Sequence, residues 1–164
     1  MNAPPPNPPQ QIAFRTLCNY LMITAGDVER ALRMHPSFDP DQHPDQLSRL
    51  RRRGECAWRW ITSYAPEDFR FTLATGSEPM PEMSTEEAAA VAALKREIDE
   101  RFLEHDEKSM AEAIYRIADE TGADRKRFFQ VMYRILVNAD RGPRLAGFLL
   151  TIGRDRLLEI LAQY

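Results

Sequence analysis

Residues 124–138, DRKRFFQVMYRILVN, hold the pattern that decides the fold. Asp124 is a typical N-cap residue, and the apolar residues after it recur at the three- and four-residue spacing of an α-helix. They form two faces: one holds Phe128, Val131, Met132 and Ile135, and the other holds Phe129, Tyr133 and Val137. A helix that is apolar on two faces has to be covered on two sides. We therefore expect this segment to be the central helix of a bundle.

The same spacing continues through most of the chain, and no convincing alternation of apolar and polar residues predicts a strand. Further helices are expected at about residues 12–25, 27–35, 45–65, 84–105 and 109–122, with another starting at 143 and a short one ending near 162. The proline-containing residues 66–83 form a long connection. The sequence thus predicts an all-α protein, a compact bundle of about seven to eight helices.

Residues at the expected helix ends support these boundaries. Ser84 with Glu87, and Ser109 with Glu112, have the spacing of a capping box, in which two side chains satisfy the free amides of a first turn. Pro143 is expected in the first turn of its helix, where its missing N–H costs nothing.

The N-terminal residues differ in composition from the rest. Residues 1–10, MNAPPPNPPQ, contain five prolines and no apolar pattern, which is typical of polyproline-type linkers. We expect residues 1–11 to be a disordered tail or linker and residues 12–164 to be one helical domain.

The net charge of −3 hides blocks of opposite sign. Ten acids and three bases between Glu78 and Glu107 give −7, and eight bases and two acids between Arg125 and Arg156 give +6. Six arginines and three acids between Arg49 and Arg70 give +3. Nineteen of the 22 cations are arginine, which suits bidentate contacts with phosphates and base edges, although a GC-rich genome gives the same bias. The blocks indicate either a side that faces a polyanion or simply solvated helix faces.

The helix expected at residues 45–65 carries a candidate stacking surface. Its core side is predicted to hold Leu47, Leu50, Gly54, Trp58, Ile61 and Ala65. Trp60 points elsewhere and shares a stripe with Arg49, Arg53 and Tyr64. An aromatic ring flanked by guanidinium groups can stack an unpaired base. The alternative is that Trp60 packs against a neighbouring helix in a bundle that is buried on two sides.

Two further groups of arginines are candidates for anion binding. Arg141-Gly142-Pro143-Arg144 starts the next expected helix, where free amides and two guanidinium groups suit an anion; the alternative is a turn with solvated arginines. Arg127 and Arg134 lie on the third side of the helix at 124–138, available to phosphate or to water.

No catalytic or metal site is expected. His35, His43 and His105 have no partner at metal or triad spacing and are interpreted as surface residues. The acidic residues 99–107 are interpreted as a solvated face, and the two cysteines do not form a metal-type pair. No phosphate-loop motif is present, and no segment approaches the roughly 18 apolar residues that span a bilayer.

Six blocks of the sequence form a recognisable set. They are residues 14–19 (FRTLCN), 55–66 (ECAWRWITSYAP), 113–118 (AIYRIA), 128–133 (FFQVMY), 141–149 (RGPRLAGFL) and 152–154 (IGR). Together, and in this order, they resemble the C-terminal helical region of class I lysyl-tRNA synthetases, over about residues 12–164. The last blocks are also similar to the chain end of bacterial glutamyl-tRNA synthetases, which have a related domain.

This resemblance implies an α-helix cage that binds the anticodon arm of lysine tRNA in the cytoplasm, without a membrane partner. The HIGH-type and KMSKS-type signatures of the family's catalytic domain are absent from these 164 residues. The chain is therefore not expected to be an enzyme on its own, and ATP and lysine would bind the catalytic domain, its expected second partner. The alternative is a freestanding paralogue that acts as a protein-interaction or regulatory RNA-binding module.

Lysine anticodons are rich in uridine, whose base offers two carbonyl acceptors and one N–H donor, so the reader needs donors and a nearby acceptor. Our hypothesis assigns stacking to Trp60 and Tyr64, base edges or phosphates to Arg53, Arg141 and Arg144, and backbone phosphates to Arg127, Arg134 and Arg154.

Overall fold

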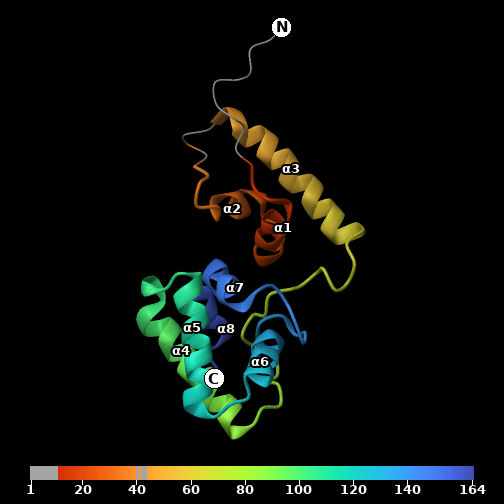
Figure 1. Cartoon of the computed structure of the whole chain (residues 1–164). Coiled ribbons are helices and arrows are strands. Elements are labelled where there is room, and N and C mark those ends of the chain that lie inside the picture. Colours follow the sequence, from red (N-terminus) through yellow and green to blue (C-terminus); the bar gives the residue numbers. More distant parts are fainter. Residues whose placement is uncertain (1–10, 40, 42–43) are drawn as a thin grey trace. The chain divides into compact units, whose positions relative to one another are not determined.

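A computed structural model of the chain describes residues 11–39, 41 and 44–164 (Figure 1). Within these residues the structure contains eight α-helices, one 3-10 helix and no β-strand. The predicted all-α fold is therefore confirmed. The predicted tail at residues 1–10 and His43 lie outside the described residues.

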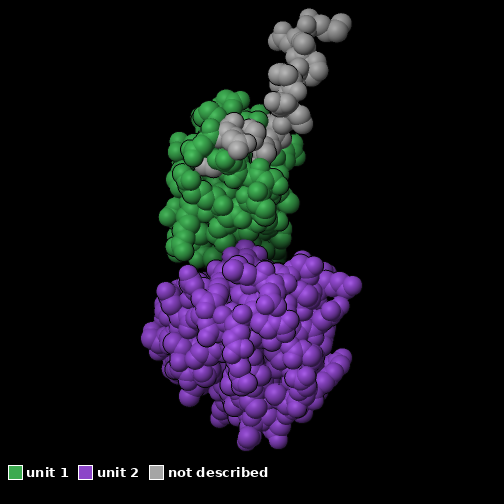
Figure 2. Space-filling model, turned by 90° about the vertical axis from the view of Figure 1, so that its left-hand side faces the viewer, with its two compact units in different colours: residues 1–71 green, residues 72–164 purple. Residues whose placement is uncertain are grey.

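The chain divides into two compact units, one up to Phe71 and one from Thr72 to Tyr164 (Figure 2). The first contains α1 (Phe14–Ile23), α2 (Val28–Arg33) and α3 (Pro44–Ser63). The second contains α4 (Thr85–Arg101), the 3-10 helix η1 (Phe102–Glu104), α5 (Glu107–Thr121), α6 (Arg125–Val137), α7 (Leu145–Ile152) and α8 (Arg154–Ile160). The single helical domain predicted over residues 12–164 stays a prediction.

In the first unit α3 packs against both α1 and α2, and its core side is the predicted one, with Leu50, Gly54 and Ile61 buried. Gly54 allows α2 to approach closely, because a Cβ there would lie 2.7 Å from Cγ1 of Val28. One turn further along α3, the Trp58 ring covers Gly26, where a Cβ would lie 2.4 Å from Cε2 of the indole. Gly26 also has a φ of +87°, which strains any other residue.

In the second unit α6 is buried on two sides, as its sequence predicts. Both predicted apolar faces contribute buried residues, while Leu136, which was in neither, is buried too and Phe129 is half-buried. The buried residues are Phe128, Val131, Met132, Tyr133, Ile135, Leu136 and Val137. The helix packs against α4 and α5, and Phe129, on the second predicted face, meets Tyr115 of α5. The end of the face that holds Tyr133 and Val137 is covered by the chain that follows α6, because a Cβ on Gly142 would lie 3.0 Å from Cδ1 of Tyr133. Irregular chain therefore takes the place that a further helix could have filled.

The connection before α4 is held against the helices of the second unit. Ala74 donates its backbone N–H to the carbonyl oxygen of Leu136 at 2.8 Å, and Arg156 donates to the carbonyl oxygen of Ala74 at 3.0 Å. Glu78 accepts hydrogen bonds from the amides of Thr75 and Gly76 at 2.8 and 2.9 Å. These bonds, with that from Thr75 foremost, lower the pKa of Glu78 to about 2. Hydrogen bonds to Leu136 of α6 and Arg156 of α8 thus hold this connection against the helices of the second unit.

The start of helix α5 differs from the prediction, whereas that of α4 agrees with it. Helix α5 begins at Glu107 because Asp106 is its N-cap: the Asp106 carboxylate accepts from the Ser109 amide at 2.7 Å, and Ser109 Oγ accepts from the Asp106 amide at 3.0 Å. The capping box predicted for Ser109 and Glu112 is therefore wrong by three residues. Ser84 and Glu87 do form the predicted capping box of α4.

The acids of residues 99–107 are exposed, as the sequence interpretation expects, but Glu97, just before them on α4, is largely buried. The Glu97 side chain is only 11% exposed and accepts from His105 Nε2 at 2.9 Å and from Arg116 at 3.2 Å. His105 is 6% exposed, with its Nδ1 3.1 Å from Ser109 Oγ. The interpretation of His105 as a surface residue is therefore wrong, because its partners come from α4 and α5 and meet only in the folded unit.

The buried Glu97 predicts a pH dependence of stability. Burial alone raises the pKa of its carboxyl, but hydrogen bonds from His105 and Arg116 and the charges of Arg116 and Arg101 outweigh burial and hold the pKa below its usual 4.5. The stabilisation is therefore complete above the unfolded-state pKa and is lost as the pH falls through the folded-state pKa.

We expect Glu97→Gln to lower the free energy of unfolding at pH 7 by about 1 kcal/mol or more. We also expect this variant to show a shallower loss of stability between about pH 5 and pH 3. Urea titrations across this range measure both effects. Glu100→Gln, at an exposed position of the same helix, is the control and should keep the original slope. Identical slopes for Glu97→Gln and the unmodified chain would contradict this account.

Candidate nucleic-acid interface

The eight predicted tRNA-binding residues fall into two sets. Arg53, Trp60 and Tyr64 belong to the first unit, in α3 or directly after it. The other five are spread over α6, the loop that follows it and the start of α8, all in the second unit: Arg127, Arg134, Arg141, Arg144 and Arg154.

Trp60 is the centre of an aromatic cluster within the first unit. Its ring meets Phe14 and Phe69 edge to face, with centroids 5.4 and 5.0 Å away, and the Arg15 guanidinium lies 4.2 Å above the Phe69 ring. Trp60 is half-buried. These contacts fit the alternative that Trp60 packs within the fold, and its predicted stacking on RNA stays a prediction.

The outer surface of α3 carries cations that no acid among the described residues neutralises. Within the part of the chain that the structure describes, Arg49, Arg52 and Arg59 are exposed and form no ion pair or side-chain hydrogen bond. Arg53 is half-buried and also unpaired among these residues, and the ring of Tyr64 is 76% exposed. Sequence reasoning missed Arg52 and Arg59 as candidates, although both belong to the basic block around Arg53.

Three of the candidate arginines in the second unit are held by acids of the same unit. Arg127 pairs with Glu87 at 3.3 Å, and Arg134 pairs with Asp140 at 2.7 Å. Arg154 donates to both the carbonyl oxygen and the carboxylate of Asp99. Each of these arginines is still 39–51% exposed. Their charges are thus partly compensated within the protein.

Arg141 and Arg144 flank a loop that is tethered to α6. The hydroxyl of Tyr133 donates to the carbonyl oxygen of Pro143 at 2.7 Å. Helix α7 starts at Leu145, after Pro143, so the prediction that Pro143 lies in the first turn of this helix is wrong. The first helical bond instead runs from Phe148 to the carbonyl oxygen of Arg144 at 2.9 Å.

Both loop arginines remain available to a ligand. Arg144 is 86% exposed and has one contact at 3.5 Å, with Glu107. Arg141 is exposed and has no ion pair or side-chain hydrogen bond in the described part of the chain.

The described residues contain neither a metal-binding cluster nor a membrane-spanning helix. No group of three or more His, Cys, Asp or Glu side chains in them could hold a metal ion. None of their helices is long and apolar enough to cross a membrane.

Comparison with known proteins identifies the relatives of the chain. Over 161 residues, 98% of this chain, it is 36% identical to a lysine–tRNA ligase of Treponema pallidum and covers 30% of that protein. It is 30% identical over 156 residues, 95% of the chain, to a lysine–tRNA ligase of Borreliella burgdorferi and covers 29% of it. No protein-family model matches.

The chain is a relative of the lysine–tRNA ligases. The similarity extends to a lysine–tRNA ligase of Pyrococcus horikoshii, 28% identical over 157 residues and 92% of the chain. The resemblance to lysyl-tRNA synthetases that the sequence blocks indicate is therefore confirmed. The chain spans about 30% of the length of the lysine–tRNA ligases that it matches.

The tether of the arginine loop can be tested. Tyr133→Phe keeps the ring that packs against Gly142 but removes the hydroxyl that holds Pro143. We expect it to lower the free energy of unfolding by about 1 kcal/mol and to speed hydrogen exchange at the amides of Arg141 and Arg144. Tyr64→Phe is the control for stability, because the Tyr64 hydroxyl has no hydrogen-bond partner among the described residues. Unchanged exchange in Tyr133→Phe would show that the hydroxyl does not hold the loop.

Proposed function

We propose that this chain is the tRNA-binding domain of a lysine–tRNA ligase, or a domain derived from one, and that it binds the anticodon arm of lysine tRNA. The observation that carries the proposal is the match of almost the whole chain to only about 30% of each relative. A part without the HIGH-type and KMSKS-type signatures suits binding of the RNA rather than chemistry. ATP and lysine would then bind outside these residues.

The distribution of charge supports an RNA partner. A protein that neutralises phosphates with Lys and Arg releases counterions from the RNA, which favours binding at low salt. The unpaired arginines of α3 and Arg141 are exposed cations available for this role. Arg134 and Arg154 can join them, because their partners Asp140 and Asp99 are exposed and an exposed ion pair stabilises a protein by only about 0–1 kcal/mol, so a phosphate can replace the carboxylate.

The exposed aromatic and arginine side chains also suit an anticodon loop. Such a loop presents unstacked bases, which proteins recognise by stacking on their faces and by hydrogen bonds to their edges. In the first unit the Tyr64 ring is 76% exposed, whereas Trp60 is engaged with Phe14 and Phe69. Tyr64 is therefore the better candidate for stacking in this unit, with Arg53 on the preceding helix.

The loop arginines provide the test. We expect Arg141→Ala combined with Arg144→Ala to weaken binding of lysine tRNA at least about tenfold, because it removes two exposed cations that can meet phosphates or base edges. We also expect a smaller dependence of the binding constant on salt, by about one power of salt concentration for each phosphate that is no longer neutralised. A gel-shift or filter titration at several low salt concentrations measures both.

Arg96→Ala is the control, because it removes an exposed cation of the acidic helix α4 that has no ion pair among the residues that the structure describes. It should change affinity less than Arg141→Ala alone. An unchanged affinity of the double variant, or a salt dependence near zero for the unmodified chain, would contradict the proposal and favour a protein-interaction module.

A further inference from the structure

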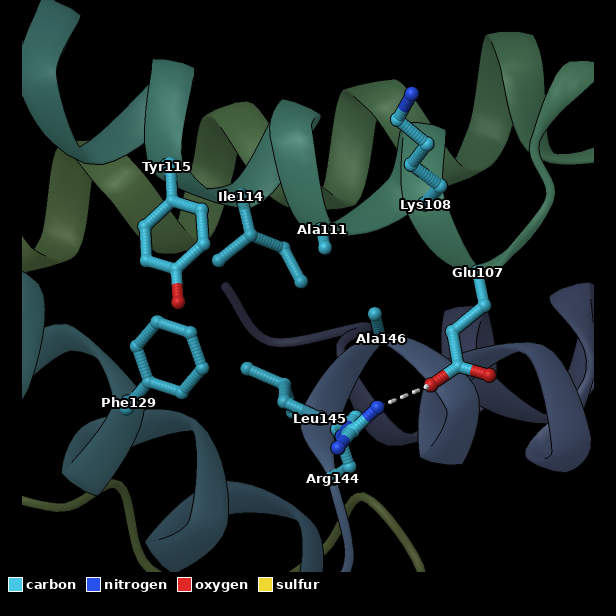
Figure 3. A pocket seen from close by; sticks show the side chains of 9 residues that line it. All are labelled: Glu107, Lys108, Ala111, Ile114, Tyr115, Phe129, Arg144, Leu145 and Ala146. Carbon is cyan, nitrogen blue, oxygen red and sulfur yellow. Dashed lines mark hydrogen bonds and ion pairs between the residues drawn. The ribbon is translucent and has the colours of Figure 1, made fainter.

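A pocket of about 480 Å³ lies within the second unit, between α5, α6 and the start of α7 (Figure 3). Its walls are aromatic and aliphatic, with Tyr115 and Phe129 at one end and Ile114 and Leu145 beside them. Its volume falls within the roughly 300–1,000 Å³ of small-molecule sites. None of the eight residues assigned to tRNA from the sequence lines it except Arg144.

The two rings form a surface that is partly open to solvent. Their centroids are 5.7 Å apart with an angle of 37° between the planes, and Tyr115 is 44% exposed while Phe129 is half-buried. Arg125 lies 5.1 Å from the Tyr115 centroid and is fixed by two bonds to Asp119, at 2.9 and 2.6 Å. The Tyr115 ring thus carries the Arg125 guanidinium on one face, while 44% of the residue is exposed.

The other end of the pocket is charged. Lys108 and Arg144 have side chains that are each 86% exposed. Lys108 approaches Glu112 only at 4.0 Å, and Arg144 approaches Glu107 only at 3.5 Å. Such weak, exposed pairs are readily exchanged for a doubly contacting anion such as a phosphate. The Glu107 carboxylate, which also lines the pocket, can accept an N–H.

An aromatic wall next to two exposed cations matches one class of ligand. A nucleotide has a flat base with a π-face on every ring and a phosphate one sugar away, and proteins bind it by stacking together with a cationic contact. An apolar side chain of a protein partner would fill the aromatic end but would leave Lys108 and Arg144 without an anion.

We propose that this pocket binds one unpaired nucleotide of the RNA, with its base against Tyr115 and Phe129 and its phosphate at Lys108 and Arg144. The proposal rests on the proposed function of RNA binding and adds a site for one base within the second unit.

The test combines affinity and crosslinking. We expect Tyr115→Leu, which keeps apolar volume but removes the ring, to weaken binding of lysine tRNA about tenfold, and Tyr115→Phe to bind like the unmodified chain. Lys108→Gln should lower the salt dependence by about one power, whereas Arg96→Gln on α4 should not. Lysine tRNA with 4-thiouridine in its anticodon loop should crosslink, in the unmodified chain, to the peptides that contain Tyr115 or Phe129.

The outcomes separate the two proposals. If the unmodified chain binds no RNA, the proposed function fails, and this pocket assignment fails with it. If the unmodified chain binds RNA but Tyr115→Leu binds equally well, or the crosslinks map away from α5 and α6, only the pocket assignment is overturned and the pocket belongs to another partner. Because crosslinking uses the unmodified chain, a folding defect in Tyr115→Leu does not affect that result.

Discussion

The second unit depends on the burial of helix α6 on two sides. Seven of its thirteen residues are buried, and neither apolar face can stay in water without losing roughly 25 cal/mol for every Å² left exposed. The helix is covered by α4 and α5, and the end of the face that holds Tyr133 and Val137 is covered by the loop that reaches α7. The hydroxyl of Tyr133 has to be satisfied in this setting, and it bonds to Pro143. That bond ties the loop that carries Arg141 and Arg144 to α6.

Acids of the second unit compensate part of the positive charge of its arginines. Acids of α4 hold arginines of other helices, as Glu87 holds Arg127 and Asp99 holds Arg154. In the first unit compensation is less complete. Arg51 pairs with Glu29, but its neighbour Arg52 has no ion pair among the described residues. The net charge of −3 therefore says little about binding, since the exposed, uncompensated cations are those that an RNA would meet.

The helices were largely predictable because their signals are local. The spacing of Leu50, Gly54 and Ile61 identifies the core side of α3, and Asp124 identifies the start of α6. Features that depend on distant partners were not predictable. The His105 side chain is buried because its partners Glu97 and Ser109 come from two different helices. The bond from Tyr133 to the carbonyl oxygen of Pro143 likewise joins α6 to the loop before α7.

The sequence predicts the kind of ligand at the candidate site, but not which side chains are available, because their partners are also distant in sequence. The basic blocks and the resemblance point to RNA, yet the ion pair of Arg127 joins residues 40 positions apart, and the edge contacts of Trp60 with Phe14 need the folded first unit. The pocket beside Tyr115 and Phe129 takes residues from three helices, so no single stretch of sequence indicates it.

The central claim is that this chain binds lysine tRNA through its anticodon. The most direct measurement compares its dissociation constants, at one salt concentration, for a lysine-tRNA transcript and for the same transcript with the anticodon uridines replaced by cytidines. The account predicts at least about tenfold weaker binding of the changed transcript, because donors and acceptors matched to uracil are left unpaired. Equal dissociation constants for the two transcripts would contradict it.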